Sequence, residues 1–159
     1  MEATVKVDAD ELKSYLNDHQ AGSIAGLELA KNLAKEHPGD EFLVKLAKDI
    51  ESDQDTLERL MEKYGAKGNT MKQAGALMVE KVGTALGEAG DELSFLRKLE
   101  TLTMGVHGKL CLWEALNEVA ETDEILRGYN FDRLMTGAQS QLDGLEEVRV
   151  KAARKALLG

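Results

Sequence analysis

The stretch that decides the fold covers residues 66–90 and reads AKGNTMKQAGALMVEKVGTALGEAG. Glycines mark its two ends, at Gly68, Gly75, Gly87 and Gly90. Between them, apolar residues recur at the spacing of a helix: Met71, Ala74, Met78, Val82 and Ala85. This pattern predicts a short helix over about residues 70–86. A connection of this length can carry the chain back along a helical bundle.

Four longer helices are predicted around this stretch. Apolar residues three and four positions apart indicate helices over about residues 10–37, 41–64, 91–127 and 130–157. Asp8 or Asp10 is a suitable N-cap for the first of them, and Asp40 for the second. Pro38 ends the first helix, and Gly65 is the expected C-cap of the second.

The order of these helices indicates a fold class. One crossover between the second and third main helices is the ferritin-like arrangement, whereas a simple up-and-down bundle needs only short loops. The sequence contains no sustained alternation of apolar and polar residues that would favour strands. We therefore expect an all-α, ferritin-like four-helix bundle with a helical crossover between main helices 2 and 3. It would form a single domain over residues 1–159.

Composition and charge exclude several classes of protein. Hydrophobic residues make up 43% of the 159 residues and aromatic residues only 4%, so the core must consist of Leu, Ala, Val and Met. The formal net charge of −9 opposes unassisted binding to nucleic acid or to anionic membranes. No apolar run is long enough to cross a bilayer, and the acidic N-terminal residues show no signal peptide. Since Cys111 is the only cysteine, a cytoplasmic location is expected.

Four stretches resemble a family of short, uncharacterised bacterial proteins with a ferritin-like fold. They are LNDHQAGS at residues 16–23, DIESDQ at 49–54, GVHGKLCLW at 105–113 and EEVRVKAA at 146–153. The resemblance spans nearly the whole chain. It implies the ferritin-like four-helix-bundle fold but no activity.

The sequence lacks the ligands of a di-iron bundle. Such a site takes one Glu from each of two helices and a Glu-x-x-His pair from each of the other two. His19 and His107 have no Glu three positions earlier, and the closest match is Glu51-x-x-Gln54. The spacing of seven between Glu100, His107 and Glu114 is too long for one ion to be shared, so this row reads as a solvated face.

Each predicted helix has an apolar stripe, a row of apolar residues three and four positions apart along one face, and two polar residues interrupt these stripes. His19 on the first helix and Asp53 on the second both occupy core positions. We expect both to be largely buried and to form a polar clasp with each other, because a buried carboxylate needs a partner. The alternative is an unusual or vestigial metal site. The candidate polar site comprises His19, Glu51, Asp53, Gln54 and His107.

Two further features have structural interpretations. Gly22 and Gly26 form a Gly-x-x-x-Gly pattern, which predicts close approach of the first helix to a neighbouring helix, opposite Trp113. Cys111 lies between two leucines and is interpreted as a packed thiol rather than a nucleophile.

We expect from these observations a non-enzymatic, metal-free bundle that acts through protein contacts and needs no cofactor. One alternative is a metal-binding stress or oxidoreductase protein of the di-iron or manganese type. Another is a carrier of a small apolar ligand, because glycines and methionines can leave adaptable apolar space. Met71, Met78 and Val82 on the crossover predict a homodimer.

Overall fold

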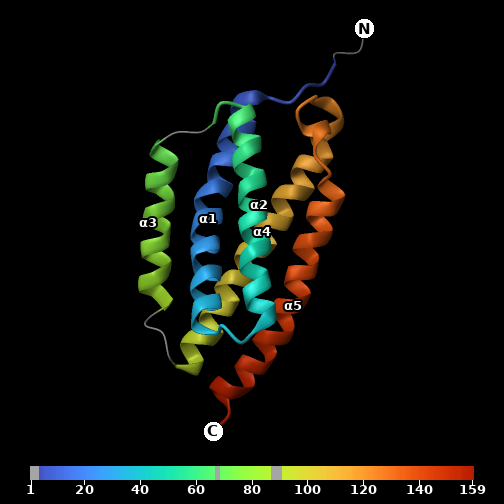
Figure 1. The fold of residues 1–159 in the computed structure, drawn as a ribbon. Helices are drawn as coiled ribbons and strands as arrows, with labels where there is room; N and C mark the ends of the chain where they lie inside the picture. Colours follow the sequence, from blue (N-terminus) through green and yellow to red (C-terminus); the bar gives the residue numbers. More distant parts are fainter. Residues whose placement is uncertain (1–3, 67–68, 87–90) are drawn as a thin grey trace.

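The computed structural model describes residues 4–66, 69–86 and 91–159. These residues form five α-helices and two 3₁₀ turns and contain no β-strand (Figure 1). The elements are α1 (Ala9–Glu36), α2 (Glu41–Lys63), α3 (Asn69–Leu86), α4 (Glu92–Val119), η1 (Ala120–Thr122), η2 (Leu126–Gly128) and α5 (Phe131–Leu157). The prediction of an all-α fold is therefore confirmed. Three glycines expected at the ends of the third helix lie outside the described residues: Gly68, Gly87 and Gly90.

Side-chain caps begin the helices where the sequence predicts them. The Asp8 carboxylate accepts hydrogen bonds from the backbone N–H groups of Asp10 and Glu11, at 3.0 and 3.2 Å. The Asp40 carboxylate accepts one from the N–H of Leu43 at 3.1 Å. Each cap satisfies backbone donors that have no partner inside the first turn of a helix.

Gly65 closes α2. Its φ of +66° lies in the left-handed region, which residues with a side chain rarely adopt. The backbone N–H of Ala66 then reaches back to the carbonyl of Met61 at 3.0 Å, which is the hydrogen bond of a glycine-terminated helix. The predicted end of the second helix is therefore confirmed.

The helices run alternately along the molecule. Figure 1 shows α1, α3 and α5 running in one direction and α2 and α4 in the other. α1 packs against α2, α3 and α4, and α4 has its largest interface with α5. By contrast, α2 and α5 meet at few positions. This arrangement brings α1, α2 and α4 together along the middle of the molecule, where they enclose the pocket described below.

Leucine forms most of the core, as the composition predicts. Six leucines have no exposed surface, each contributing about 1.5–3 kcal/mol through removal of its side chain from water: Leu16, Leu33, Leu60, Leu99, Leu126 and Leu145. They come from all four long helices and from η2. None of the described helices combines the length and the apolar character needed to cross a membrane.

The fourth predicted helix ends earlier than expected. Sequence periodicity extends it to about residue 127, but α4 ends at Val119 and two 3₁₀ turns follow. The cause is Asp123, whose carboxylate accepts hydrogen bonds from the backbone N–H groups of Ile125 and Leu126 at 2.9 and 3.0 Å. An Asp side chain that bonds to nearby backbone favours a turn over a continuous helix.

Tyr64 holds this turn against the end of α2, and its replacement by Phe should destabilise the protein. The phenol donates a hydrogen bond to Asp123 at 2.6 Å, so Tyr64→Phe should lower the free energy of unfolding by about 1 kcal/mol at neutral pH. Burial and the Asp123 hydrogen bond raise the pKa of Tyr64 above its ordinary value of 10.0.

The raised pKa of Tyr64 also predicts how the difference in free energy of unfolding between wild type and Tyr64→Phe depends on pH. The folded state keeps the phenol proton at a pH where the unfolded chain has lost it, so the stability from Tyr64 is lost as pH rises above 10. Urea denaturation at pH 7 and at pH about 10.5 should therefore show the difference between wild type and Tyr64→Phe shrinking. If the difference in free energy of unfolding were the same at both pH values, the raised pKa of Tyr64 would be contradicted.

Candidate functional site

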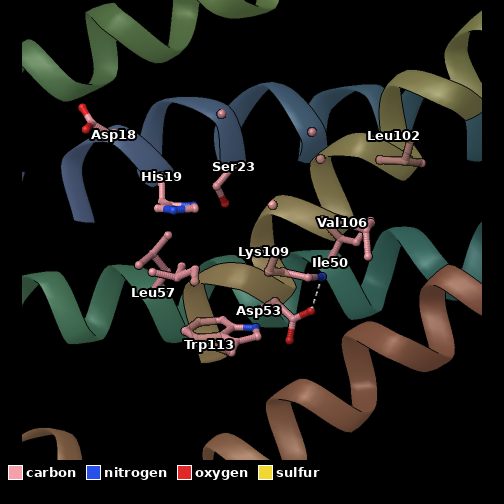
Figure 2. Close-up of a pocket in the computed structure, with 15 residues that line it drawn as sticks. Asp18, His19, Ser23, Ile50, Asp53, Leu57, Leu102, Val106, Lys109 and Trp113 are labelled. Carbon is pink, nitrogen blue, oxygen red and sulfur yellow. Dashed lines mark hydrogen bonds and ion pairs between the residues drawn. The ribbon is translucent and has the colours of Figure 1, made fainter. Parts of the chain in front are cut away.

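A pocket of about 190 Å³ lies between α1, α2 and α4 (Figure 2). Its lining is mostly apolar and includes Ile50, Leu57, Leu102, Val106, Leu112 and Trp113. Polar side chains reach it from all three helices: Asp18, His19 and Ser23 from α1, Asp53 from α2 and Lys109 from α4. The four remaining lining residues are glycines. The pocket therefore combines apolar walls with a few polar groups, as small-molecule sites do.

The glycines in the walls face open space. Gly22 and Gly26 lie on α1 and Gly105 and Gly108 on α4, and a Cβ atom added at any of them would meet nothing within 4 Å. The predicted close approach of α1 to another helix at Gly22 and Gly26 is therefore wrong. Gly22 and Gly105 are exposed, so the pocket is open to solvent on the side that these glycines form.

Two other helical glycines show what close approach looks like in this protein. A Cβ on Gly75 would come within 2.5 Å of the Ile24 side chain, which places α3 directly against α1. A Cβ on Gly144 would overlap the ring of Phe42, which brings α2 against α5 at that point. The pocket glycines differ from these two because nothing packs on them.

A largely buried ion pair lies where α2, α4 and α5 meet. The Lys109 ammonium donates to the Asp53 carboxylate at 2.5 Å, and the Gln141 amide donates to the same oxygen at 3.1 Å. The two charged side chains are only 14% and 16% exposed. Burial lowers the pKa of Lys109, and the Asp53 charge opposes that shift. This cluster lies between the pocket and a polar groove between α2 and α5. Asp53 lines both the pocket and the groove, and Gln141 lines the groove.

A second polar cluster joins α1 to α2. The Ser23 hydroxyl donates to the Gln54 carbonyl oxygen, and the Gln54 amide donates to Gln20 and to Glu58, at 3.3 Å in each case. Gln20 and Gln54 are both buried. The cluster satisfies these amides and fixes the Ser23 side chain beside the pocket.

Among the described residues, His19 is a half-buried polar side chain of the pocket for which no hydrogen bond is formed. Figure 2 shows it extending from α1 beside Ser23, into the space above Leu57 and Trp113. The half-buried imidazole packs edge-on against Tyr15, with 4.7 Å between ring centroids. Burial lowers the pKa of His19, and the neighbouring Asp18 charge partly opposes that shift.

The structure brings some of the predicted site residues together and separates others. His19 and Asp53 line the same pocket, and Gln54 is buried beside it. Glu51 is exposed and forms a surface ion pair with Lys31 at 2.9 Å, and His107 is exposed. Within the described residues, no three His, Cys, Asp or Glu side chains are grouped so that they could hold a metal ion.

The predicted clasp between His19 and Asp53 is not formed as a direct hydrogen bond. Among the described residues, the Asp53 carboxylate bonds to Lys109 and Gln141, and no hydrogen bond links it to His19. His19 is half-buried, whereas we expected it to be largely buried. The physical reason is that an ammonium is a stronger partner for a buried carboxylate than a neutral imidazole.

The interpretation of Cys111 as a packed thiol is also wrong, because Cys111 is exposed. Its neighbours Leu110 and Leu112 are both buried. Since successive residues of a helix are rotated by about 100°, Leu110 and Leu112 lie at the two edges of the buried face. Cys111 lies between them on the side of α4 that faces away from the core.

Sequence reasoning missed Lys109 and Gln141. Both stand at core spacing: Lys109 is three residues after Val106 and four before Trp113, and Gln141 lies between Ala138 and Leu145. The same stripe rule that singles out His19 and Asp53 would have found them.

One further polar atom near the pocket lacks a partner. Trp113 is only 1% exposed, and its indole Nε1–H makes no hydrogen bond in the described part of the chain. Figure 2 shows the nitrogen edge of the ring turned towards Asp53. An unsatisfied buried N–H costs about 1–3 kcal/mol.

Comparisons with the models of known protein families, with curated proteins and with solved structures gave no match for this chain.

Proposed function

We propose that this protein binds a small, mainly apolar molecule in the pocket between α1, α2 and α4. The observation that carries the proposal is the set of four helical glycines on α1 and α4 that line the pocket and leave open space where a Cβ atom would stand.

The size of the pocket suits a single-ring molecule. Its volume of about 190 Å³ is slightly larger than the 150 Å³ of an engineered apolar cavity that binds benzene. The apolar walls favour removal of such a molecule from water, at about 25 cal/mol for each Å² of apolar surface buried.

The four pocket glycines lower the stability of their helices, and this loss needs an explanation. A glycine inside a helix is about 1 kcal/mol less favourable than alanine. At Gly22, Gly26, Gly105 and Gly108 the structure has room for the extra methyl group, so packing within the chain does not explain the glycine. A site that must stay open for a ligand does explain it, as stability is often lower where function needs space.

The charged residues around the pocket do not require a charged ligand. Lys109 is paired with Asp53, so neither group requires a charged ligand. Asp53 is the less exposed of the two carboxylates in the pocket, and its ion pair with Lys109 argues against a metal ion at that position.

We also propose that the bundle is ferritin-like, with α1, α2, α4 and α5 as its main helices and α3 as the crossover. The order and directions of the helices support this. In such bundles, ligand and cofactor sites lie in the core between facing helices, which is where the pocket is found.

Self-association remains a prediction. Leu77 and Met78 on α3 are 62% and 38% exposed, and Val82 packs against the core. The side chain of Met71 lies outside the described part of the structure. The exposed pair is compatible with the predicted homodimer.

Filling the pocket should raise stability and abolish binding. The double variant Gly26→Ala/Gly108→Ala is expected to gain up to about 2 kcal/mol in the free energy of unfolding, because both glycines lie inside helices and face space. The same two methyl groups occupy the site, so toluene should no longer raise the melting temperature of the variant as it raises that of the wild type.

Gly137→Ala is the matched control. Gly137 lies inside α5, also has open space at its Cβ position and does not line the pocket. It should stabilise the protein without changing toluene binding. Unchanged toluene binding in the double variant would rule out this pocket as the site.

A further inference from the structure

We infer that the ligand is an uncharged single-ring compound that carries one hydroxyl group, and that this hydroxyl bonds to His19. This inference rests on the proposed function and names the class of ligand for the same pocket.

His19 is the half-buried polar side chain from α1 that is available to a ligand, whereas Asp18 is exposed to solvent. The Ser23 hydroxyl is already bonded to Gln54, and on the opposite walls Lys109 and Asp53 are bonded to each other. Within the described residues, the imidazole of His19 has no hydrogen-bond partner and contacts only the ring edge of Tyr15 among aromatic groups. Figure 2 shows the imidazole beneath α1 beside Ser23, with the apolar side chains of Leu57 and Trp113 on the side away from α1.

The chemistry of a neutral imidazole selects the polar group of the ligand. Partial burial lowers the pKa of His19, so the ring is neutral near pH 7. A neutral imidazole has one donor nitrogen and one acceptor nitrogen. A hydroxyl group can donate to the acceptor nitrogen, whereas a methyl group of the same size cannot.

The charge around the pocket disfavours ionised ligands. Asp18 and Asp53 carry negative charge, and Lys109 is the lining residue that carries positive charge and is already paired. A carboxylate or phenolate would therefore meet net repulsion. A ligand amine could pair with Asp18, but Asp18 is exposed, and pairs in solvent contribute little.

Phenol and toluene form a matched pair of probes because they differ only in a hydroxyl in place of a methyl group. The dissociation constants of both should be measured by calorimetry for the wild type, His19→Leu and His19→Gln. His19→Leu is expected to weaken phenol binding about fivefold, the loss of one hydrogen bond. Toluene binding should change by less than about twofold. His19→Gln retains a donor and an acceptor and should recover part of the phenol affinity.

The outcomes separate the inference from the proposed function. If toluene binds the wild type but His19→Leu weakens phenol and toluene binding equally, the inference about the hydroxyl group is wrong. The proposed function of the pocket is then still supported. If neither compound binds, the proposed function itself is wrong. Two other results would also overturn the inference: tighter binding of benzylamine than of phenol, and loss of the phenol preference in Trp113→Phe but not in His19→Leu.

Discussion

Lys109→Met should lower the free energy of unfolding by about 3 kcal/mol. The substitution keeps most of the volume of the side chain but removes the ammonium, which leaves the Asp53 carboxylate, only 16% exposed, with the Gln141 amide as its partner. Removing one partner of a buried ion pair is costly because the other charge stays out of water. Urea denaturation near pH 7 measures the loss.

Two comparisons make this prediction specific. The double variant Asp53→Leu/Lys109→Met removes both charges and should be much closer to wild type than either single variant. Lys31→Met breaks the exposed pair with Glu51 and should change stability far less than Lys109→Met does, because solvent screens exposed charges. If Lys109→Met were as mild as Lys31→Met, the buried pair would not contribute as described.

Gly144→Ala should destabilise the protein by about 1–3 kcal/mol, as overpacking does in cores. The new methyl group would overlap the ring of Phe42, so α2 and α5 would have to move apart at one of the few places where they meet. Thermal denaturation followed by circular dichroism would measure the effect.

Gly137→Ala, seven residues earlier on the same helix, is the control, because its added Cβ meets nothing and the substitution should be stabilising. Replacing Phe42 with Leu in the Gly144→Ala background should restore part of the stability, since the smaller side chain vacates the contact. Equal effects of the two alanine substitutions would show that the Phe42 contact is unimportant.

The helices and most of their ends could be predicted because local chemistry determines them. Asp8 and Asp40 cap helices through hydrogen bonds to backbone only a few residues away, and Gly65 adopts a conformation that favours glycine. The end of α4 was missed although its cause is also local, the Asp123 carboxylate that bonds to the backbone N–H groups of Ile125 and Leu126. The contact that Tyr64 makes with this turn could not be predicted, because Tyr64 is distant in the sequence from Asp123 and reaches it only in the folded protein.

The candidate site was predicted in part for a related reason. A stripe shows that Asp53 is on the buried face of its helix, but it does not say which helix supplies the partner. The sequence favours His19, whereas the fold brings Lys109 to Asp53 from α4. Glycines present the same difficulty. Gly26 and Gly144 look alike in the sequence, yet one faces a pocket and the other an aromatic ring.

Trp113 provides the most direct test of ligand binding in the pocket. It is the only tryptophan of the chain, so its indole N–H gives a single signal in a ¹H–¹⁵N correlation spectrum. Titration of the wild type with toluene should move this signal saturably, and the Gly26→Ala/Gly108→Ala variant should show a folded spectrum with no such movement. An indole signal that stays in place in the wild type, or that moves equally in the filled variant, would contradict a binding site between α1, α2 and α4.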